Sequence, residues 1–208
     1  MIIPTVSPLG TYGWGPYVER FCLGENDTFG TCAFAGIGNG HVIVTTVVKG
    51  VGEVMSDGEI EAMDHAVTGF MPTDPASDHG AALSAVLDYW AANGWAGDPT
   101  LVPLDRQAIE KRQIADAVDA MGWAYCWFQL PMIDDDPDLS DASVNQGIEG
   151  SAAHCMTVTD AAPGLFWVAT WGERRAVTAA WMDRYWRGGF AVLHRDWVRP
   201  VAAGTALG

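Results

Sequence analysis

The chain has 208 residues, which suits one α+β domain with its own core and is short for two. Its net charge is −15 and its only lysines are Lys49 and Lys111, which argues against a phosphate-binding surface and a nucleic-acid partner. The longest apolar run is too short and too polar to span a bilayer, so we expect no membrane partner.

Both ends of the chain predict little regular structure. Residues 1–20 are rich in Gly, Pro and aromatic residues, which favours an irregular segment. Residues 200–208 predict a flexible tail, and no linker divides the rest, so we predict one domain over residues 1–208. The N-terminus has neither a basic region nor a long apolar stretch, so no signal peptide is recognised and the cysteines are expected to be reduced. Nothing in the sequence indicates an oligomeric state.

The first half of the chain predicts helices over residues 33–48, 57–68 and 80–93. Thr31 is the N-cap candidate of the first, and the glycines inside that helix would allow close backbone packing if it is buried. The second helix has an acidic first turn that suits the helix dipole. Asp78 is the N-cap candidate of the third.

The second half predicts one more helix and then a sheet. A short strand over residues 100–103 precedes an amphipathic helix over 106–121. An apolar, aromatic-rich strand follows over 123–130, and residues 133–151 predict an acidic loop. The last predicted elements are strands over residues 155–159, 165–170 and 190–194, with a short helix over 178–186. Helices first and strands later favour an α+β fold over alternating βαβ units.

Cys32 is the cysteine best placed for chemistry. It falls in the first turn of a predicted helix, where the dipole stabilises a thiolate. Cys126 alternates with aromatic residues in a strand and is interpreted as a core residue, while Cys22 has no supporting context. Cys155 follows His154 in a strand, where adjacent side chains point to opposite faces. If His154 faces a cleft, Cys155 therefore faces the core.

The segment Gly30-Thr31-Cys32-Ala33-Phe34 resembles the nucleophile turn of papain-like cysteine peptidases, where Gly-x-Cys opens the central helix. The order of the later elements is similar as well: a helix and strand, the segment Gly150-Ser151-Ala152-Ala153-His154, two strands and the pair Trp171-Gly172. The resemblance covers residues 20–198. It implies a papain-like α+β fold in which an N-terminal helix bearing the nucleophile packs on a C-terminal antiparallel sheet.

Carried over residue by residue, the resemblance implies that Cys32 is the nucleophile and His154 the base that shares its proton. Six positions before the nucleophile, the family has a Gln whose amide helps to bind the oxyanion. Asn26 occupies that position here, and its shorter side chain can donate the same hydrogen bond. Asn26 is therefore a candidate oxyanion ligand.

The third catalytic position departs from the family. Alignment on Trp171-Gly172 places Ala169 where the family has Asn, and an alanine cannot orient an imidazole. Thr170 and Asp160 are the alternatives for this role, and Thr170 is counted among the candidate site residues. The departure bears on activity more than on fold.

No cofactor and no metal is expected. Asp64-His65 and Asp78-His79 lack a second His at helical spacing. The acidic run that starts at Asp134 resembles the opening of a calcium loop, but Leu139 stands where the EF-hand needs Gly and Asn145 where it needs Glu.

Two hypotheses of different class follow. In the first, the protein is a cysteine hydrolase of a peptide or amide substrate. In the second, the fold is catalytically silent and serves as a structural or interaction protein with a protein partner in an assembly. The segments Gly69-Phe70, Asp78-His79-Gly80-Ala81 and Val86-Leu87-Asp88-Tyr89-Trp90 resemble a region of papain-like proteins encoded by bacteriophages and related bacterial loci. The predicted location is cytoplasmic or virion-associated.

Overall fold

The computed structural model describes residues 12–94, 103–130, 132–133, 136–137, 139 and 152–194. The helices are α1 (Cys32–Lys49), α2 (Asp57–Thr68), α3 (Leu83–Asn93), α4 (Ile114–Met121) and α5 (Ala179–Tyr185). The strands are β1 (Tyr12–Gly13), β2 (Pro103–Ala108), β3 (Ala124–Leu130), β4 (Met132–Ile133), β5 (Asp136–Pro137), β6 (Ala152–Ala162), β7 (Leu165–Thr170), β8 (Glu173–Thr178) and β9 (Trp186–His194). None of the described helices has the length and apolar character that a membrane crossing needs.

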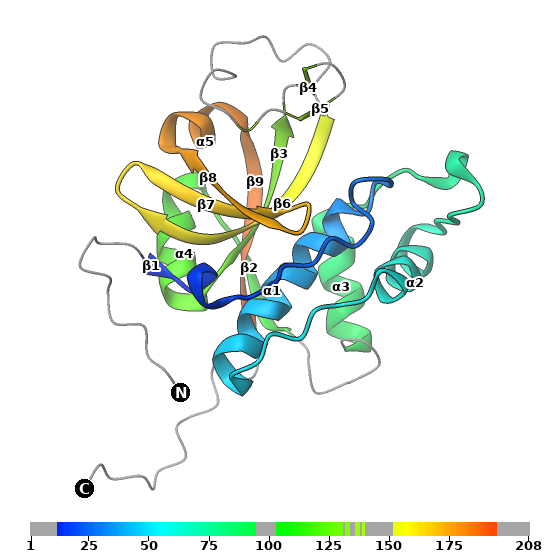
Figure 1. Cartoon of the computed structure of the whole chain (residues 1–208), viewed down its shortest axis with the longest axis horizontal. Helices are drawn as coiled ribbons and strands as arrows, with labels where there is room; N and C mark the ends of the chain where they lie inside the picture. The colour runs from blue at the N-terminus through cyan, green and yellow to red at the C-terminus, as the bar shows by residue number, and fades with distance from the viewer. Residues whose placement is uncertain are drawn as a thin grey trace, which may run out of the picture.

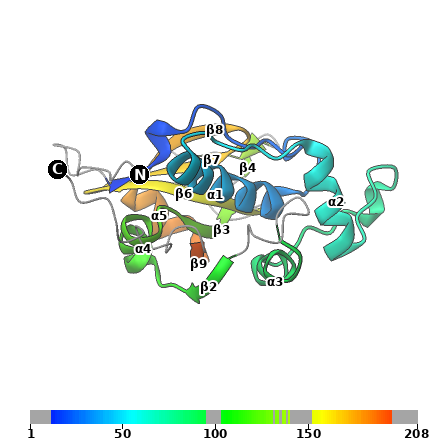
Figure 2. The same ribbon diagram turned by 90° about the horizontal axis from the view of Figure 1, so that it is seen from below.

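One antiparallel sheet organises the molecule. Its strand order is β2-β9-β3-β6-β7-β8, and β1 pairs with β6 beside this path. Figure 1 shows α1, α2 and α3 gathered on one side of the molecule, with the sheet, α4 and α5 on the other. In Figure 2, α1 covers one face of the sheet while α4 and α5 lie on the opposite face. The predicted α+β class, with α1 packed on an antiparallel sheet, is confirmed.

Strand β3 is apolar except for Gln129, and helices cover both of its faces. Trp123 and Tyr125 are fully buried in the core under α1. Cys126 and Phe128 alternate with them and lie in a second core, which also contains residues of α4 and α5. Burial on both faces removes the polar alternation of a half-exposed strand.

The glycines of α1 let the helix backbone approach the sheet. A Cβ added at Gly40 would lie 2.4 Å from the ring of Trp123, and one at Gly36 would lie 3.0 Å from Tyr125. Two hydrogen bonds hold α1 at this distance: the Tyr125 hydroxyl donates to the carbonyl of Ala33 at 2.6 Å, and the Thr157 hydroxyl donates to the carbonyl of Gly36. The predicted close packing is therefore confirmed.

The two predicted helix caps differ in outcome: Thr31 takes the predicted N-cap position, whereas Asp78 does not. Thr31 stands at the N-cap position of α1, but its hydroxyl donates to the carbonyl of Gly24 at 2.6 Å and caps nothing. Helix α3 begins at Leu83 rather than residue 80. Asp78 lies before it and accepts a hydrogen bond from the Gly30 backbone N–H at 2.7 Å. Each of these side chains hydrogen-bonds to a backbone group of a loop rather than to the first turn of the helix that it was predicted to cap.

Residues 106–108, predicted as the start of a helix, belong to strand β2 and pair with β9. A capping box between Glu110 and Gln113 starts the helical segment, and α4 itself begins at Ile114. Strand β8 was not predicted either, because its Glu and Arg residues give it no apolar pattern, although it forms an edge strand of the sheet.

The N-terminal segment is less irregular than predicted. Residues 12–13 form β1 against β6, and a short 3-10 helix follows at Gly15–Tyr17. Residues 1–11, the predicted tail at 200–208 and most of the acidic loop at 133–151 lie outside the described residues.

Candidate active site

Cys32 is the first residue of α1, so its thiol stands at the positive end of an 18-residue helix. The first turn of this helix carries no acidic residue, and the dipole there is not neutralised from within the helix. The backbone N–H of a first helical residue has no partner in its helix, which leaves that of Cys32 available to an anion. This position favours the thiolate over the thiol.

His154 extends from β6 and is held by two residues that follow it in the chain. Its Nε2 lies 2.7 Å from the hydroxyl oxygen of Thr170, the last residue of the neighbouring strand β7. Its ring stacks on Trp171, with centroids 4.5 Å apart and planes inclined by 13°. With only 8 % of its surface exposed, His154 has few alternative orientations.

The stacking depends on the turn between β7 and β8. Trp171 and Gly172 form a two-residue connection with φ of 48° and 72°, while Thr170 pairs with Glu173. Positive φ at both central residues is typical of a type I′ hairpin turn. A bulky residue rarely adopts this conformation, and such strain is concentrated at functional sites. The turn places the indole against the imidazole.

Thr170 therefore lies where an orienting residue is needed, whereas Ala169, at the aligned position, and Asp160, the other alternative, do not. Ala169 is buried in the core under α1. Asp160 is fully buried elsewhere on β6, where it accepts hydrogen bonds from Thr159 at 2.6 Å and Arg174 at 2.8 Å. The catalytic role of Thr170 remains a prediction, and its geometry suits that role.

The thiols differ sharply in acidity. A hydrogen bond with the Cys155 thiol, followed by the hydrogen bond and charge of His154, lowers the pKa of Cys32 well below its usual value, although burial opposes this. The same hydrogen bond to Cys32, together with burial, raises the pKa of Cys155 well above its usual value. Burial raises the pKa of Cys22 and of Cys126 to about 12. Cys32 is thus the thiol most able to act as a nucleophile.

The contact between Cys155 and Cys32 was missed by the sequence analysis. Alternation along the strand correctly places Cys155 in the core, where it is 7 % exposed. That core ends at the N-terminus of α1, so Cys155 also meets Cys32. The contact depends on how far α1 is displaced along β6, and no pattern within either segment encodes this displacement.

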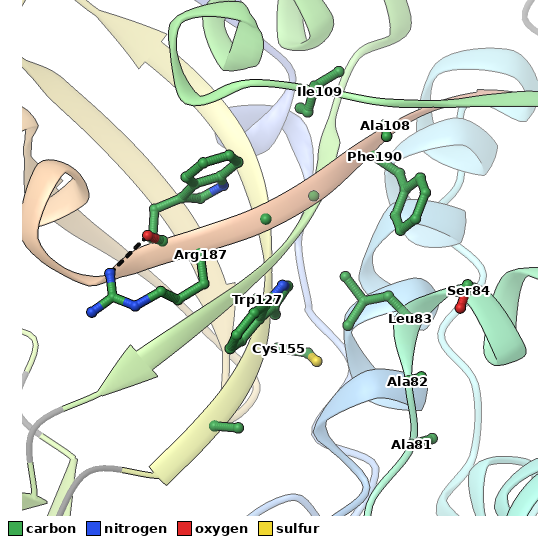
Figure 3. Close-up of a pocket in the computed structure, with 14 residues that line it drawn as sticks. Ala81, Ala82, Leu83, Ser84, Ala108, Ile109, Trp127, Cys155, Arg187 and Phe190 are labelled. Atoms are coloured by element: carbon green, nitrogen blue, oxygen red, sulfur yellow. Dashed lines mark hydrogen bonds between the residues drawn. The ribbon is translucent and has the colours of Figure 1, made fainter.

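Two cavities meet at this point. One, of about 480 Å³, is lined by Cys32 and Cys155 and by the loop that carries Asp78 and His79. The other, of about 580 Å³, extends from Cys155 across the sheet, and Figure 3 shows the sulfur of Cys155 pointing into it from β6. The apolar side chains that line the second cavity include Leu83, Ile109, Trp127 and Phe190. Both cavities share Ala81, Ala82, Ala153 and Cys155, so they adjoin, and the two together are called the cleft.

Asn26 lies in the turn that precedes α1, where its backbone N–H donates to the carbonyl of Leu23 at 3.2 Å. Its side chain is partly buried, and it is not among the residues that line either described cavity. Its role as an oxyanion ligand stays a prediction.

The acidic and histidine pairs of the sequence have local structural partners. Asp64 accepts a hydrogen bond from the Thr68 hydroxyl at 2.6 Å, and Nδ1 of His65 lies 2.9 Å from the carbonyl oxygen of Phe70. Within the described part of the chain, no three His, Cys, Asp or Glu side chains are grouped as a metal ion would require. Most of the acidic run that starts at Asp134 lies outside that part.

No family model matches the sequence, and no curated protein sequence matches it. Solved structures do match. The digestive procathepsin L 3 from the larval midgut of Tenebrio molitor has a TM-score of 0.55 at 10 % identity, covering 90 % of this chain and 71 % of that chain. A structure concerned with antibody cross reactivity between the mite allergens Blo t 1 and Der p 1 has a TM-score of 0.54 at 9 % identity, covering 91 % and 72 %. The fold of this chain is papain-like, as the sequence predicted.

Proposed function

We propose that this protein is a cysteine hydrolase that cleaves a peptide or amide bond by acyl transfer. The observation that carries the proposal is the row formed by Cys32, His154 and Thr170, in which the helix terminus supports the thiolate and the hydroxyl holds the imidazole. A nucleophile, a base within reach and a third group that orients the base are the arrangement that this chemistry needs.

Each residue then has a defined step. The Cys32 thiolate attacks the carbonyl carbon, and its backbone N–H, with the Asn26 amide, stabilises the oxyanion. As the C–N bond breaks, the His154 imidazolium gives its proton to the leaving amine and a thioester remains on Cys32. His154 next accepts a proton from water, which attacks the thioester and releases the acid. Thr170 holds Nε2 throughout, so that the other ring nitrogen can exchange the proton.

The cleft supports a substrate with an extended apolar portion. The cavity at Cys32, of about 480 Å³, is proposed to take the substrate backbone, and the apolar cavity beyond Cys155 suits a large apolar side chain next to the scissile bond. We expect peptides with an aromatic or branched aliphatic residue near the cleavage point to react fastest.

The test of the thiolate is the rate of Cys32 alkylation by iodoacetamide as a function of pH. Wild type should label at a pH well below the ordinary thiol pKa of about 8.5. His154→Ala should shift labelling toward that value, because the imidazolium no longer stabilises the anion. His65→Ala, which alters a histidine of α2, is the matched control and should follow wild type. Identical profiles for all three proteins would refute the thiolate–imidazolium pair.

Turnover is tested separately with a pool of fluorogenic peptide amides. Wild type should release amine, and quenching in acid should trap a thioester on Cys32. Cys32→Ala should do neither. If the thiol is reactive and no peptide in the pool is cleaved, the alternative function is favoured, in which the fold serves as a structural or interaction protein, for example in a phage particle.

A further inference from the structure

The register between α1 and β6 brings a second cysteine to the nucleophile. The Thr157 hydroxyl donates to the carbonyl of Gly36, which fixes one point of contact between strand and helix. Cys32 precedes Gly36 by one helical turn, about 6 Å along the axis. Cys155 precedes Thr157 by two residues on the same face of the strand, about 6.7 Å away. The two displacements nearly match, and both cysteines line the same cavity.

The backbone of the helix is also in contact with the strand here. A Cβ added at Gly36 would meet the carbonyl carbon of Cys155 at 3.9 Å and the ring of Tyr125 at 3.0 Å. With no side chain at this position, the backbone of α1 lies directly on β6. Cys32 and Cys155 line the same cavity across this contact, and the interaction between their thiols lowers the pKa of Cys32 and raises that of Cys155.

We propose that Cys32 and Cys155 are a redox-reactive pair, which a peroxide converts into an intramolecular disulfide and a dithiol reduces again. The proposal goes beyond hydrolysis and rests on the proposed function only through the reactivity of Cys32. The modified site is the nucleophile itself, so the oxidised protein cannot form a thioester. Reduction restores it.

The reaction balances in two steps. The Cys32 thiolate attacks one oxygen of hydrogen peroxide and breaks the O–O bond, giving a sulfenic acid on Cys32 and a hydroxide ion. The Cys155 sulfur then attacks the Cys32 sulfur. The S–S bond forms as the S–O bond breaks, and the hydroxyl leaves as water with the proton of Cys155. The two sulfurs lose two electrons in total, which the peroxide accepts.

The other two cysteines have no comparable arrangement. Cys22 packs beneath α1, where its backbone N–H donates to the Asn39 side chain at 2.7 Å and its sulfur lies 3.8 Å from the carbonyl oxygen of Met55. Cys126 lies in the core on the opposite face of the sheet. Both are fully buried, with thiols whose pKa is raised to about 12, so neither supplies a thiolate near neutral pH.

The experiment exposes the reduced full-length protein to hydrogen peroxide and measures intact mass and free thiols after denaturation. Wild type should lose about 2 Da, as expected for a disulfide, and its four free thiols should fall to two. Peptide mapping should locate the bond between Cys32 and Cys155. Dithiothreitol should restore both the mass and the iodoacetamide labelling of Cys32.

Two variants separate the pair from general thiol oxidation. In Cys155→Ala the sulfenic acid has no partner, so Cys32 should proceed to the sulfinic acid, a gain of about 32 Da that dithiothreitol does not reverse. Cys126→Ala is the matched control and should form the disulfide as wild type does. If Cys155→Ala does not fold, Cys155→Ser replaces it, and the wild-type peptide map decides without any variant.

The proposal is overturned if wild type gains oxygen without losing two thiols, if the bond maps to another pair, or if peroxide leaves Cys32 unmodified. Because the readout is mass rather than turnover, the disulfide can form in a protein that cleaves no peptide. An active hydrolase in which no disulfide forms would refute this proposal and leave the proposed function intact.

Discussion

Replacing Thr170 by Val is the sharpest test of how His154 is held. The substitution keeps the branched shape of the side chain and removes the hydroxyl that lies 2.7 Å from Nε2. Trp171 still stacks on the ring, so the imidazole remains in the site and loses only its polar partner. The change therefore isolates one hydrogen bond.

The magnitude follows from the charge of the donor. A hydrogen bond from an imidazolium contributes about 1.5–3 kcal/mol, and one from a neutral ring contributes about 0.5–1.5 kcal/mol. Its removal therefore destabilises the thiolate–imidazolium pair relative to the neutral thiol–imidazole pair by about 1 kcal/mol. At about 1.4 kcal/mol per factor of ten, the ratio of the thiolate–imidazolium pair to the neutral thiol–imidazole pair should fall about fivefold. The pH profile of Cys32 alkylation should therefore move to higher pH.

The assay is the iodoacetamide rate from acidic to alkaline pH, with Thr170→Ser as the control that keeps the hydroxyl. Ser should follow wild type, and Val should be displaced. If the Val variant gave the wild-type pH profile, or if the Ser and Val variants were displaced equally, the hydrogen bond between His154 and Thr170 would not support the thiolate. A circular-dichroism melt of each variant verifies that the folded state is retained.

Two further predictions concern the core. Gly40→Ala places a methyl group 2.4 Å from the ring of Trp123 and should lower the free energy of unfolding by about 1–3 kcal/mol in urea titrations. The control, Gly58→Ala on α2, meets no atom within 4 Å and should raise that free energy by about 0.5–1 kcal/mol. Equal effects of the two substitutions would contradict the close packing of α1 on the sheet. The thiols of Cys22 and Cys126 have a pKa of about 12 in the folded protein, whereas in the unfolded chain they ionise near pH 9. Above about pH 9 the unfolded state therefore binds fewer protons than the folded state. The free energy of unfolding should then fall by about 1.4 kcal/mol per pH unit for each thiol. Urea titrations with a phosphine reductant should show a shallower fall in Cys126→Ala, and an unchanged slope would count against a buried neutral thiol there.

Local patterns sufficed for much of the fold. The second helix was predicted over 57–68, where the structure has α2, because an acidic first turn and a following glycine mark its ends. Strand β7 was likewise predicted over its whole length, 165–170. These elements carry their signals within their own residues. Residues 106–108 of strand β2 were mistaken for helix because the pairing of β2 with β9 is a non-local interaction that its residues do not encode.

The candidate site likewise combines features that are local in the sequence with contacts that depend on tertiary packing. Residue type, order and a glycine before the nucleophile single out Cys32 and His154, since a helix start and a strand position are local properties. The stacking of Trp171 on His154 depends on a turn with positive φ, and the approach of Cys155 to Cys32 depends on the register of α1 against β6. Sequence alone therefore singled out the candidate side chains for the proposed chemistry. Only tertiary packing decided that Thr170 meets the imidazole and that a second thiol meets the first, because both contacts join segments whose separation in space no local pattern records.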